Sequence, residues 1–418
     1  MQTRRSLLAA GLAAPALCAW RQPEQNPYVL IGKEGRYVPL LADLRRKAEA
    51  GGEGASGNLQ LLAQYLATLG DERGALAAWE QDYPPRARRD GPDLKGAAAE
   101  NALEAIVAAS RGRRIVMLNE AHHLSRNRAF AEQVALRLRE EGFSVLAAET
   151  FEHDRPFDDG VVGMDDGAYL RDPVFASMVR AASWAGYRLA EYEVRDDQGA
   201  PKGATGAERI AAREQAQADN LITGALADPK ARVLVYCGFA HLAKQPTRRG
   251  DLWFAARLKA KSGIDPLTVE QSAGAPASEP ARDSAVVAAV LARFSPKAPV
   301  VVRRPDRSLV HTPSGEDFAA DLSVFHPRLA DRNGRPGWLA FGRRREIRVD
   351  LRLAPAGRIR LLQAVPTDEL AKAPAVVPTD QYLLDPEAKS GFLWLSPGRY
   401  LIRVETLEGF APLRELAV

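Results

Sequence analysis

The sequence has 418 residues, of which 46% are hydrophobic and 26% charged, with 28 prolines and 33 glycines. This length predicts two or three domains, and the balance of apolar and charged residues excludes intrinsic disorder and a collagen-like chain. The 57 basic residues are interspersed with 53 acidic ones, giving a net charge of +4, so no nucleic-acid-binding stripe is expected. Two cysteines, Cys18 and Cys237, offer no disulfide framework.

The first twenty residues have the pattern of an export signal. Met1 to Arg5 is basic, and Ser6 to Trp20 is an apolar stretch too short to span a bilayer as a stable helix. The pair Arg4-Arg5 is typical of a twin-arginine signal. Leu17 is too bulky for the cleavage motif that precedes a lipid-modified cysteine, so lipoprotein anchoring is not expected. We therefore expect a periplasmic or secreted protein with no transmembrane span in its mature form.

Residues 21 to 92 are predicted to form a small helical region. Leucines and Tyr65 recur at helical spacing between residues 58 and 81, and Gly70-Asp71 separates them from a second apolar run that ends at Trp79. This resembles a single tetratricopeptide-like helix pair, which indicates a packing appendage more than a partner-binding array. The glycine pattern Gly52 to Gly57 has dinucleotide-binding spacing, but it follows a charged helical stretch and not a strand, so that function is rejected.

From residue 93 to 333 helices and strands alternate, which predicts an α/β domain with a parallel-type sheet and flanking helices. Four strands are expected at residues 115–118, 144–148, 187–194 and 232–236, with further strands at 300–302 and 321–325. A helix that Ser125 caps should end at Gly142, and a capping box of Thr205 and Glu208 should open a helix that runs through Leu226. Residues 271–283 are rich in Ala, Ser and Pro and are interpreted as a loose connector.

In residues 334 to 418 the hydrophobic residues recur with a period of two. Ile347, Val349, Leu351 and Leu353 alternate with charged residues, and the same pattern returns near 359–361 and 400–404. Antiparallel sheets with one wet face have this pattern. A small C-terminal antiparallel β-sandwich is therefore expected.

Side chains capable of chemistry follow the predicted strands of the α/β domain. The first strand leads into residues 119–123, the second ends at Glu149, the third contains Glu191 and Glu193, and the fourth leads to His241. Loops after parallel strands converge on one crevice, so these groups are expected to meet there. A histidine near neutral pKa can take a proton from water while carboxylates orient it.

The same residue types also permit a metal site. Glu120, His122, His123 and His241 are a possible ligand set for a divalent cation, which would lower the pKa of bound water. The H-E-x-x-H motif of zinc peptidases is absent, and so is a G-x-S-x-G nucleophile elbow, which disfavours a serine esterase.

These segments together resemble the erythromycin-esterase-like group, part of a superfamily with the TIKI/TraB and ChaN proteins. Its signature is a strand followed by G-E-x-H or G-E-x-x-H, a second strand closing on Glu, and a late G-x-x-H. His122 fits the first spacing and His123 the second, so the match is undecided, while Glu149 and His241 match the later positions. The helix carrying Arg213, Gln217 and Asn220 is similar to a further family motif. Asn119 replaces the usual Gly and Glu214 the usual Asp, and the resemblance covers residues 97 to 245.

The resemblance implies three activities: metal-independent ester hydrolysis, metal-dependent peptide hydrolysis, or binding of iron or haem without catalysis. We expect an exported hydrolase acting on an ester or amide of a small molecule or peptide. The expected catalytic residues are Glu120, His122, His123, Glu149 and His241, and the expected substrate-binding residues are Arg213, Asn220 and Glu191. The cofactor is left open between none, a divalent metal and haem. Two alternatives stand beside the hydrolase: a periplasmic metal- or haem-binding protein, and a non-catalytic scaffold that binds a partner.

Overall fold

A computed structural model describes residues 26–52, 54–84, 91–151, 159–247, 250–312 and 320–418. The expected export signal, including Cys18, lies outside these residues. Within them, no helix is long and apolar enough to cross a membrane.

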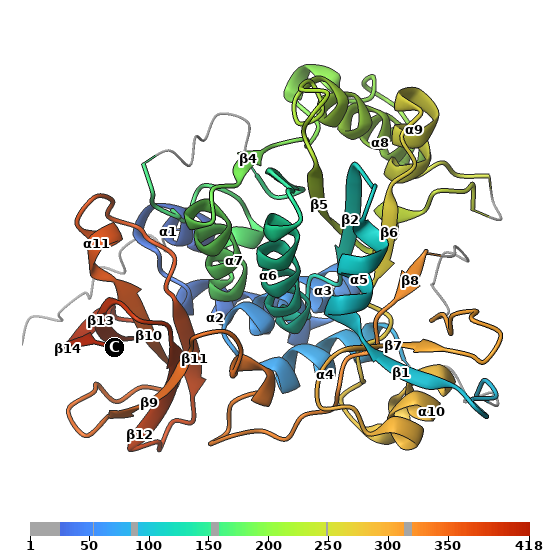
Figure 1. Ribbon diagram of the computed structural model, residues 1–418. Coiled ribbons are helices and arrows are strands. Elements are labelled where there is room, and N and C mark those ends of the chain that lie inside the picture. Colours follow the sequence, from blue (N-terminus) through green and yellow to red (C-terminus); the bar gives the residue numbers. More distant parts are fainter. Residues whose placement is uncertain (1–25, 53, 85–90, 152–158, 248–249, 313–319) are drawn as a thin grey trace, which may run out of the picture.

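The centre of the molecule is a six-stranded parallel sheet with the strand order β4-β3-β5-β2-β6-β8 (Figure 1). The strands are β2 (Ile115–Glu120), β3 (Val145–Ala148), β4 (Arg188–Ala190), β5 (Val233–Gly238), β6 (Leu267–Glu270) and β8 (Leu322–Ser323). β2, β3 and β5 are buried along their whole length, as strands covered on both faces must be. The α/β fold class with a parallel sheet is confirmed.

Helices cover both faces of this sheet. Alternate strand residues, including Val116 and Leu234, pack against α5 (Ala102–Ser110), α6 (Ser125–Glu140) and α7 (Pro173–Trp184). The intervening residues, including Met117 and Val235, pack against α8 (Gly206–Thr223) and α9 (Phe254–Ser262). The period of two along each strand thus divides the core into two layers.

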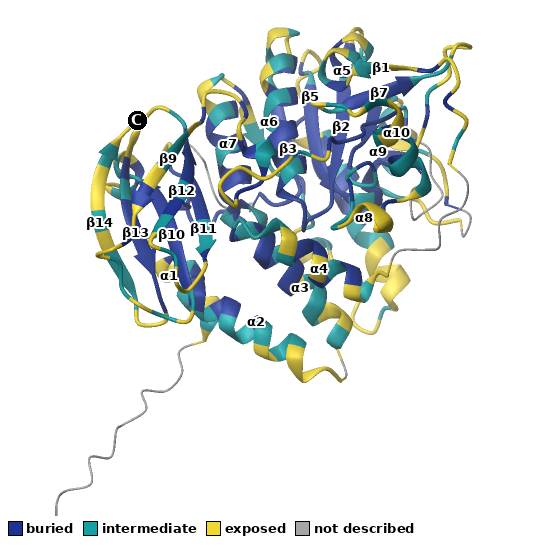
Figure 2. Ribbon diagram, turned by 90° about the horizontal axis from the view of Figure 1, so that it is seen from below, coloured by how far each residue is buried: buried dark blue, intermediate teal, exposed yellow. Residues whose placement is uncertain are grey.

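The N-terminal region contains four helices: α1 (Pro27–Glu34), α2 (Val38–Ala50), α3 (Ala55–Thr68) and α4 (Glu72–Asp82). Figure 2 shows α2, α3 and α4 running beside the central sheet. Their buried side chains, such as Leu41 and Leu66, belong to the same apolar cluster as Val116 of β2. The helical region is therefore built into the core of the α/β domain.

The C-terminal strands form two antiparallel sheets, as the alternating pattern predicts. One has the order β11-β10-β13-β14 and the other pairs β12 with β9. Their bounds are β9 (Arg345–Asp350), β10 (Arg360–Pro366), β11 (Asp380–Leu384), β12 (Ser390–Leu395), β13 (Arg399–Glu405) and β14 (Phe410–Ala417), with α11 (Thr367–Leu370) after β10. Val349 and Leu393 of the smaller sheet share a buried cluster with Leu362 and Ile402 of the larger one, so the two sheets pack as a small sandwich.

Several predicted elements differ from the structure. The third strand ends at Ala190, so Glu191 and Glu193 follow it, and the helix opened by Thr205 ends at Thr223. β7 (Val300–Arg303) pairs antiparallel with β1 (Ala98–Asn101) beside α10 (Ala285–Phe294), outside the central sheet. The 271–283 segment is no loose connector at its ends, because Gln271 and Asp283 are buried.

Candidate active site

A cleft of about 760 Å³ opens where β2, β3, β5 and β6 end. Loops after parallel strands converge at this edge, as the sequence predicts. Helices α3 and α4 of the N-terminal region complete its wall. The polar side chains on the cleft include Gln60, His122, Glu149, Arg213, His241, Glu270 and Ser272.

His122 follows β2 and is held by the glutamate that ends the strand. Its Nδ1 lies 2.8 Å from Oε1 of Glu120. Arg128 on α6 donates two hydrogen bonds to the same carboxylate, at 2.7 and 2.8 Å. Burial alone would raise the pKa of Glu120, but the Arg128 guanidinium lowers it well below its usual range. Glu120 is therefore ionised and can only accept, so Nδ1 of His122 donates the hydrogen bond between them.

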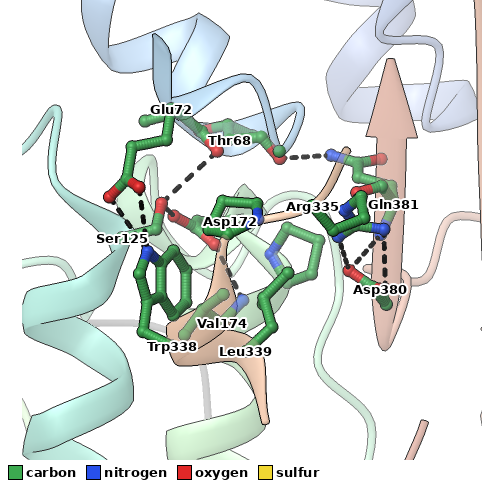
Figure 3. A pocket seen from close by; sticks show the side chains of 14 residues that line it. Thr68, Glu72, Ser125, Asp172, Val174, Arg335, Trp338, Leu339, Asp380 and Gln381 are labelled. Carbon is green, nitrogen blue, oxygen red and sulfur yellow. Dashed lines mark hydrogen bonds and ion pairs between the residues drawn. The ribbon is translucent and has the colours of Figure 1, made fainter. Parts of the chain in front are cut away.

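Arg128 is itself fixed by a second carboxylate. Its Nη1 lies 2.6 Å from Oδ2 of Asp172, which also accepts from Ser125 Oγ at 2.5 Å, and Oδ1 of Asp172 accepts from the backbone N–H of Val174 at 2.7 Å. Figure 3 shows Ser125, Asp172 and Val174 together at a junction with Trp338. The gap there is only about 20 Å³, room for about one water molecule, so it is a packing junction.

Glu149 ends β3 on the opposite side of β5 from Glu120. Its Oε1 accepts from Arg213 Nη2 at 2.7 Å and its Oε2 from the N–H of Gly238 at 2.7 Å. Burial would raise the pKa of Glu149, but the neighbouring His241, His122 and Arg213 side chains lower it to about 2. Arg213 also pairs with Glu193, whose carboxylate lies 3.0 Å from its Nε. Arg213 is thus anchored on one side of the cleft.

His241 lies between two carboxylates. Its Nδ1 is 2.9 Å from Oε1 of Glu214 on α8, and its Nε2 is 3.7 Å from Oε1 of Glu149. Burial lowers the pKa of His241, but Glu149 and Glu214 raise it more, so the net shift is upward. This upward shift favours the protonated ring, in which Nε2 is an N–H donor.

The turn after β5 brings these groups close together. A Cβ on Gly238 would lie 2.8 Å from Nε2 of His122 and 3.1 Å from Oε2 of Glu149, so only glycine leaves room. The next residue, Phe239, has a φ of +33°, a strained conformation for a non-glycine residue. Such strain gathers at functional sites.

The structure separates the two histidines that the sequence left undecided. His122 faces the cleft and stacks on Tyr169, with ring centroids 4.1 Å apart. His123 stacks instead on Trp79 of α4, at 4.0 Å, and lines a neighbouring cavity. His122, with the G-E-x-H spacing, is therefore the cleft histidine.

Two of the expected substrate-binding residues, Asn220 and Glu191, do not line the cleft. Asn220 donates to the backbone oxygen of Glu193 at 2.7 Å and to Gln198 at 2.8 Å, so it holds the segment after β4. Glu191 is not among the residues that line the cleft, and Glu193 is the carboxylate that meets Arg213. The sequence predicts a strand over 187–194, along which alternation would point Glu191 and Glu193 to the same face. Because β4 ends at Ala190, that alternation does not decide which of the two glutamates faces the cleft.

The expected metal set does not form in the part of the chain that the structure describes. No three His, Cys, Asp or Glu side chains there are arranged to hold an ion. Nδ1 of His122 is taken up by Glu120, and the Glu120 carboxylate by Arg128. His123 faces away from His241. The residues present therefore do not fit a divalent metal held by Glu120, His122, His123 and His241.

Sequence reasoning missed the aromatic wall of the cleft and several supporting groups. Trp79, Tyr83, Tyr169, Phe239 and Trp253 line the cleft, and Arg128, Asp172 and Glu214 hold its ionised groups. Charged side chains are rarely fully buried unless they are paired, so a charged residue on the apolar face of a helix indicates a buried partner. Arg128 and Glu214 are such residues.

The fold and the cleft together define an α/β protein with a histidine–carboxylate site at the carboxyl edge of its sheet. No protein-family model matches the chain, and no curated protein matches it. Among solved structures it is similar to "The structure of the type III effector HopBA1", with 12% identity and a TM-score of 0.32 over 58% of this chain and 96% of that one. It is also similar to "Bacterial protein toxins", with 16% identity and a TM-score of 0.31 over 50% and 45%. At these TM-scores neither similarity indicates a function.

Proposed function

We propose that the protein is a hydrolase in which His122 activates water to cleave an ester or amide bond. One observation carries this proposal: Nδ1 of His122 is held at 2.8 Å by Glu120, a carboxylate that is itself paired with Arg128. In the proposed mechanism Nδ1 keeps its proton and Nε2 acts as the base. This is how a neutral imidazole is oriented for general-base catalysis.

The reaction uses the groups on the cleft in sequence. Nε2 of His122 takes a proton from water, and the oxygen attacks the carbonyl carbon. The resulting oxyanion is stabilised by the protonated His241 and by Arg213, both aimed at the same cleft. When the carbon–oxygen or carbon–nitrogen bond breaks, the proton on His122 passes to the leaving group, giving an acid and an alcohol or amine.

The resemblance of residues 97 to 245 to the erythromycin-esterase-like superfamily supports this proposal through the motif residues Glu120, His122, Glu149 and His241. Export to the periplasm is part of the same proposal and rests on residues 1 to 20 of the sequence. Cell fractionation tests it: a chain with Arg4→Lys and Arg5→Lys should stay in the cytoplasm, and its export at the normal level would contradict a twin-arginine signal.

The deciding experiment compares His122→Ala with His123→Ala on a panel of ester and amide substrates. We expect His122→Ala to lose roughly 10²- to 10⁴-fold in turnover, the usual contribution of a general base. His123→Ala is the matched control, and its loss should be far smaller because His123 lies outside the cleft. Unchanged turnover in both variants would reject the mechanism.

Elemental mass spectrometry on protein prepared without chelators tests the metal- or haem-binding alternative. We expect no stoichiometric metal in the wild-type chain. Near-stoichiometric metal that is lost in a His122→Ala, His241→Ala variant would contradict the proposal, and iron would point to haem.

A further inference from the structure

A second cavity lies next to the catalytic cleft. It has a volume of about 390 Å³, within the range of small-molecule sites, and it opens between α4, the loop after β2 and the loop after β6. Trp79, Tyr83 and Phe239 line both cavities, as do Ser272 and Ala273, so the two cavities adjoin each other. We call this cavity the side chamber.

The floor of the side chamber is apolar. Leu76, Ala121 and Leu124 form one buried cluster, with Phe239 and Ala275 packed against it. The charged groups at its rim are satisfied by one another: Glu80 pairs with Arg282 at 3.0 Å and accepts from Ser278 at 2.7 Å. Among the described residues, the rim therefore offers no free charge to a ligand.

His123 also lines this cavity, and it is neutral. Burial lowers its pKa to about 3, and the neighbouring His122 and Arg128 act in the same direction. No described group hydrogen-bonds to its buried Nδ1, and its ring stacks on Trp79. An uncharged imidazole among aliphatic and aromatic side chains favours an uncharged ligand group.

We propose that the side chamber binds an uncharged hydrocarbon group of the substrate while His122 acts on the adjoining ester or amide bond. The inference rests on the proposed hydrolase function and gives it a substrate class, namely esters or amides with one apolar arm. Burying each further methylene group should raise the affinity roughly fourfold, so affinity should rise with chain length.

The test blocks the chamber and measures binding separately from turnover. Ala275 lines the chamber and is not on the cleft, so Ala275→Trp should fill the chamber and Ala275→Leu should narrow it. Ala227→Trp, at an exposed position after α8, is the matched control for folding and for an added indole. Melting curves verify that each variant is folded.

Titration calorimetry with 1-octanol measures the chamber directly. We expect wild type, His122→Ala and Ala227→Trp to bind it alike, and Ala275→Trp to bind at least tenfold more weakly, with Ala275→Leu in between. No binding to wild type, or equal binding to all variants, would overturn the proposal.

Turnover of two ester series identifies which arm enters the chamber. One series lengthens the acyl chain of 4-nitrophenyl esters, and the other lengthens the alcohol of alkyl acetates. A preference for the longer chain in one series, lost in Ala275→Trp, supports the proposal and names the arm. If no ester is cleaved but octanol binding behaves as expected, the chamber stands and the hydrolase function fails. If esters are cleaved without chain preference or octanol binding, the chamber proposal fails alone.

Discussion

His122 and His241 present the same side chain to one cleft in two different electrostatic settings. The carboxylate behind His122 is paired with Arg128, which donates two hydrogen bonds to it. His241 has Glu214 behind it and Glu149 in front, and its pKa is raised. Two histidines in contrasting surroundings can divide the roles of base and acid between them.

The pH dependence of turnover should follow from this difference. Glu214→Gln removes one of the two carboxylates that raise the pKa of His241, so the protonated ring is lost at lower pH. We expect the alkaline limb of kcat/KM to move down by about one pH unit. The free energy of unfolding changes in the same sense. The raised pKa of His241 contributes stability that is complete below the pKa of this histidine in the unfolded chain. That stability is lost as the pH rises through its pKa in the folded protein. In Glu214→Gln that loss should therefore occur at lower pH.

The measurements are pH profiles of kcat/KM and of melting temperature for wild type, Glu214→Gln and Glu279→Gln. Glu279 is exposed and serves as the matched control. An alkaline limb that stays in place in Glu214→Gln would show that His241 does not supply the essential acid.

At the residue scale, sequence reasoning placed Glu120, His122, Glu149, Arg213 and His241 on or beside the cleft. It could not choose between His122 and His123, because adjacent residues after a strand point in different directions and the turn alone decides which faces the cleft. It could not find Trp79 either. That side chain comes from a helix about forty residues earlier, and only tertiary packing brings it to the sheet edge.

At the scale of elements, the turn from β5 into the 3₁₀ helix at Phe239–Leu242 sets the geometry of the site. Gly238 donates to Glu149 while passing close to the ring of His122. The φ of +33° at Phe239 then directs the chain so that His241 returns to the cleft. The G-x-x-H spacing therefore has a physical reason: the glycine makes room and the strained residue turns the chain.

Gly238→Ala tests that reading. Its Cβ would lie 2.7 Å from Cε1 of His122, so the ring or the strand must move. A displacement of about 1 Å can cost roughly 10²-fold in rate, and we expect a loss of that order in kcat. Gly57→Ala on α3 is the matched control, since nothing lies within 4 Å of its added Cβ, and a helical alanine should stabilise by about 0.5–1 kcal/mol. Full activity in Gly238→Ala, measured with melting curves, would contradict the close approach.

The elements predicted well were those with long periodic patterns. β2 and β5, α6 and α8, and the C-terminal alternation were visible because burial on one or two faces repeats along them. β8 lies within the strand expected at 321–325, whereas β6 was missed because it contributes only four residues, too few to show a period. β1 and β7 pair across about two hundred residues, and nothing local in the sequence encodes that partner.

At the scale of the whole molecule, the three regions are one packed body. Leu41 of α2, Val116 of β2 and Leu361 of β10 lie in the same buried cluster. Glu405 of β13 accepts from the backbone N–H groups of Tyr37 and Val38 at 3.1 and 2.9 Å, where α2 begins. A further buried pair, Arg335 with Asp380 at 2.8 Å, ties the segment before β9 to β11 (Figure 3).

Deleting residues 334 to 418 should therefore unfold the N-terminal helices and not merely remove an appendage. The deletion leaves the N–H groups of Tyr37 and Val38 without Glu405, and each buried unsatisfied donor costs about 1–3 kcal/mol. It also exposes the apolar surface that Leu361 and Val377 cover in the common cluster. Since α4 carries Trp79 to the cleft, we expect the truncated chain to lose both its cooperative melting transition and its turnover.

Circular dichroism melting and size-exclusion chromatography check this, with Glu405→Gln as a milder variant that keeps the whole chain. Glu405→Gln should melt in one transition at a lower temperature than wild type. A truncated chain that remains monomeric, melts cooperatively and keeps its activity would show that the C-terminal sheets are a separable module. That outcome would revive the interpretation in which these sheets bind a partner of their own, whereas joint loss of folding and turnover means that they support the site through α2 and α4.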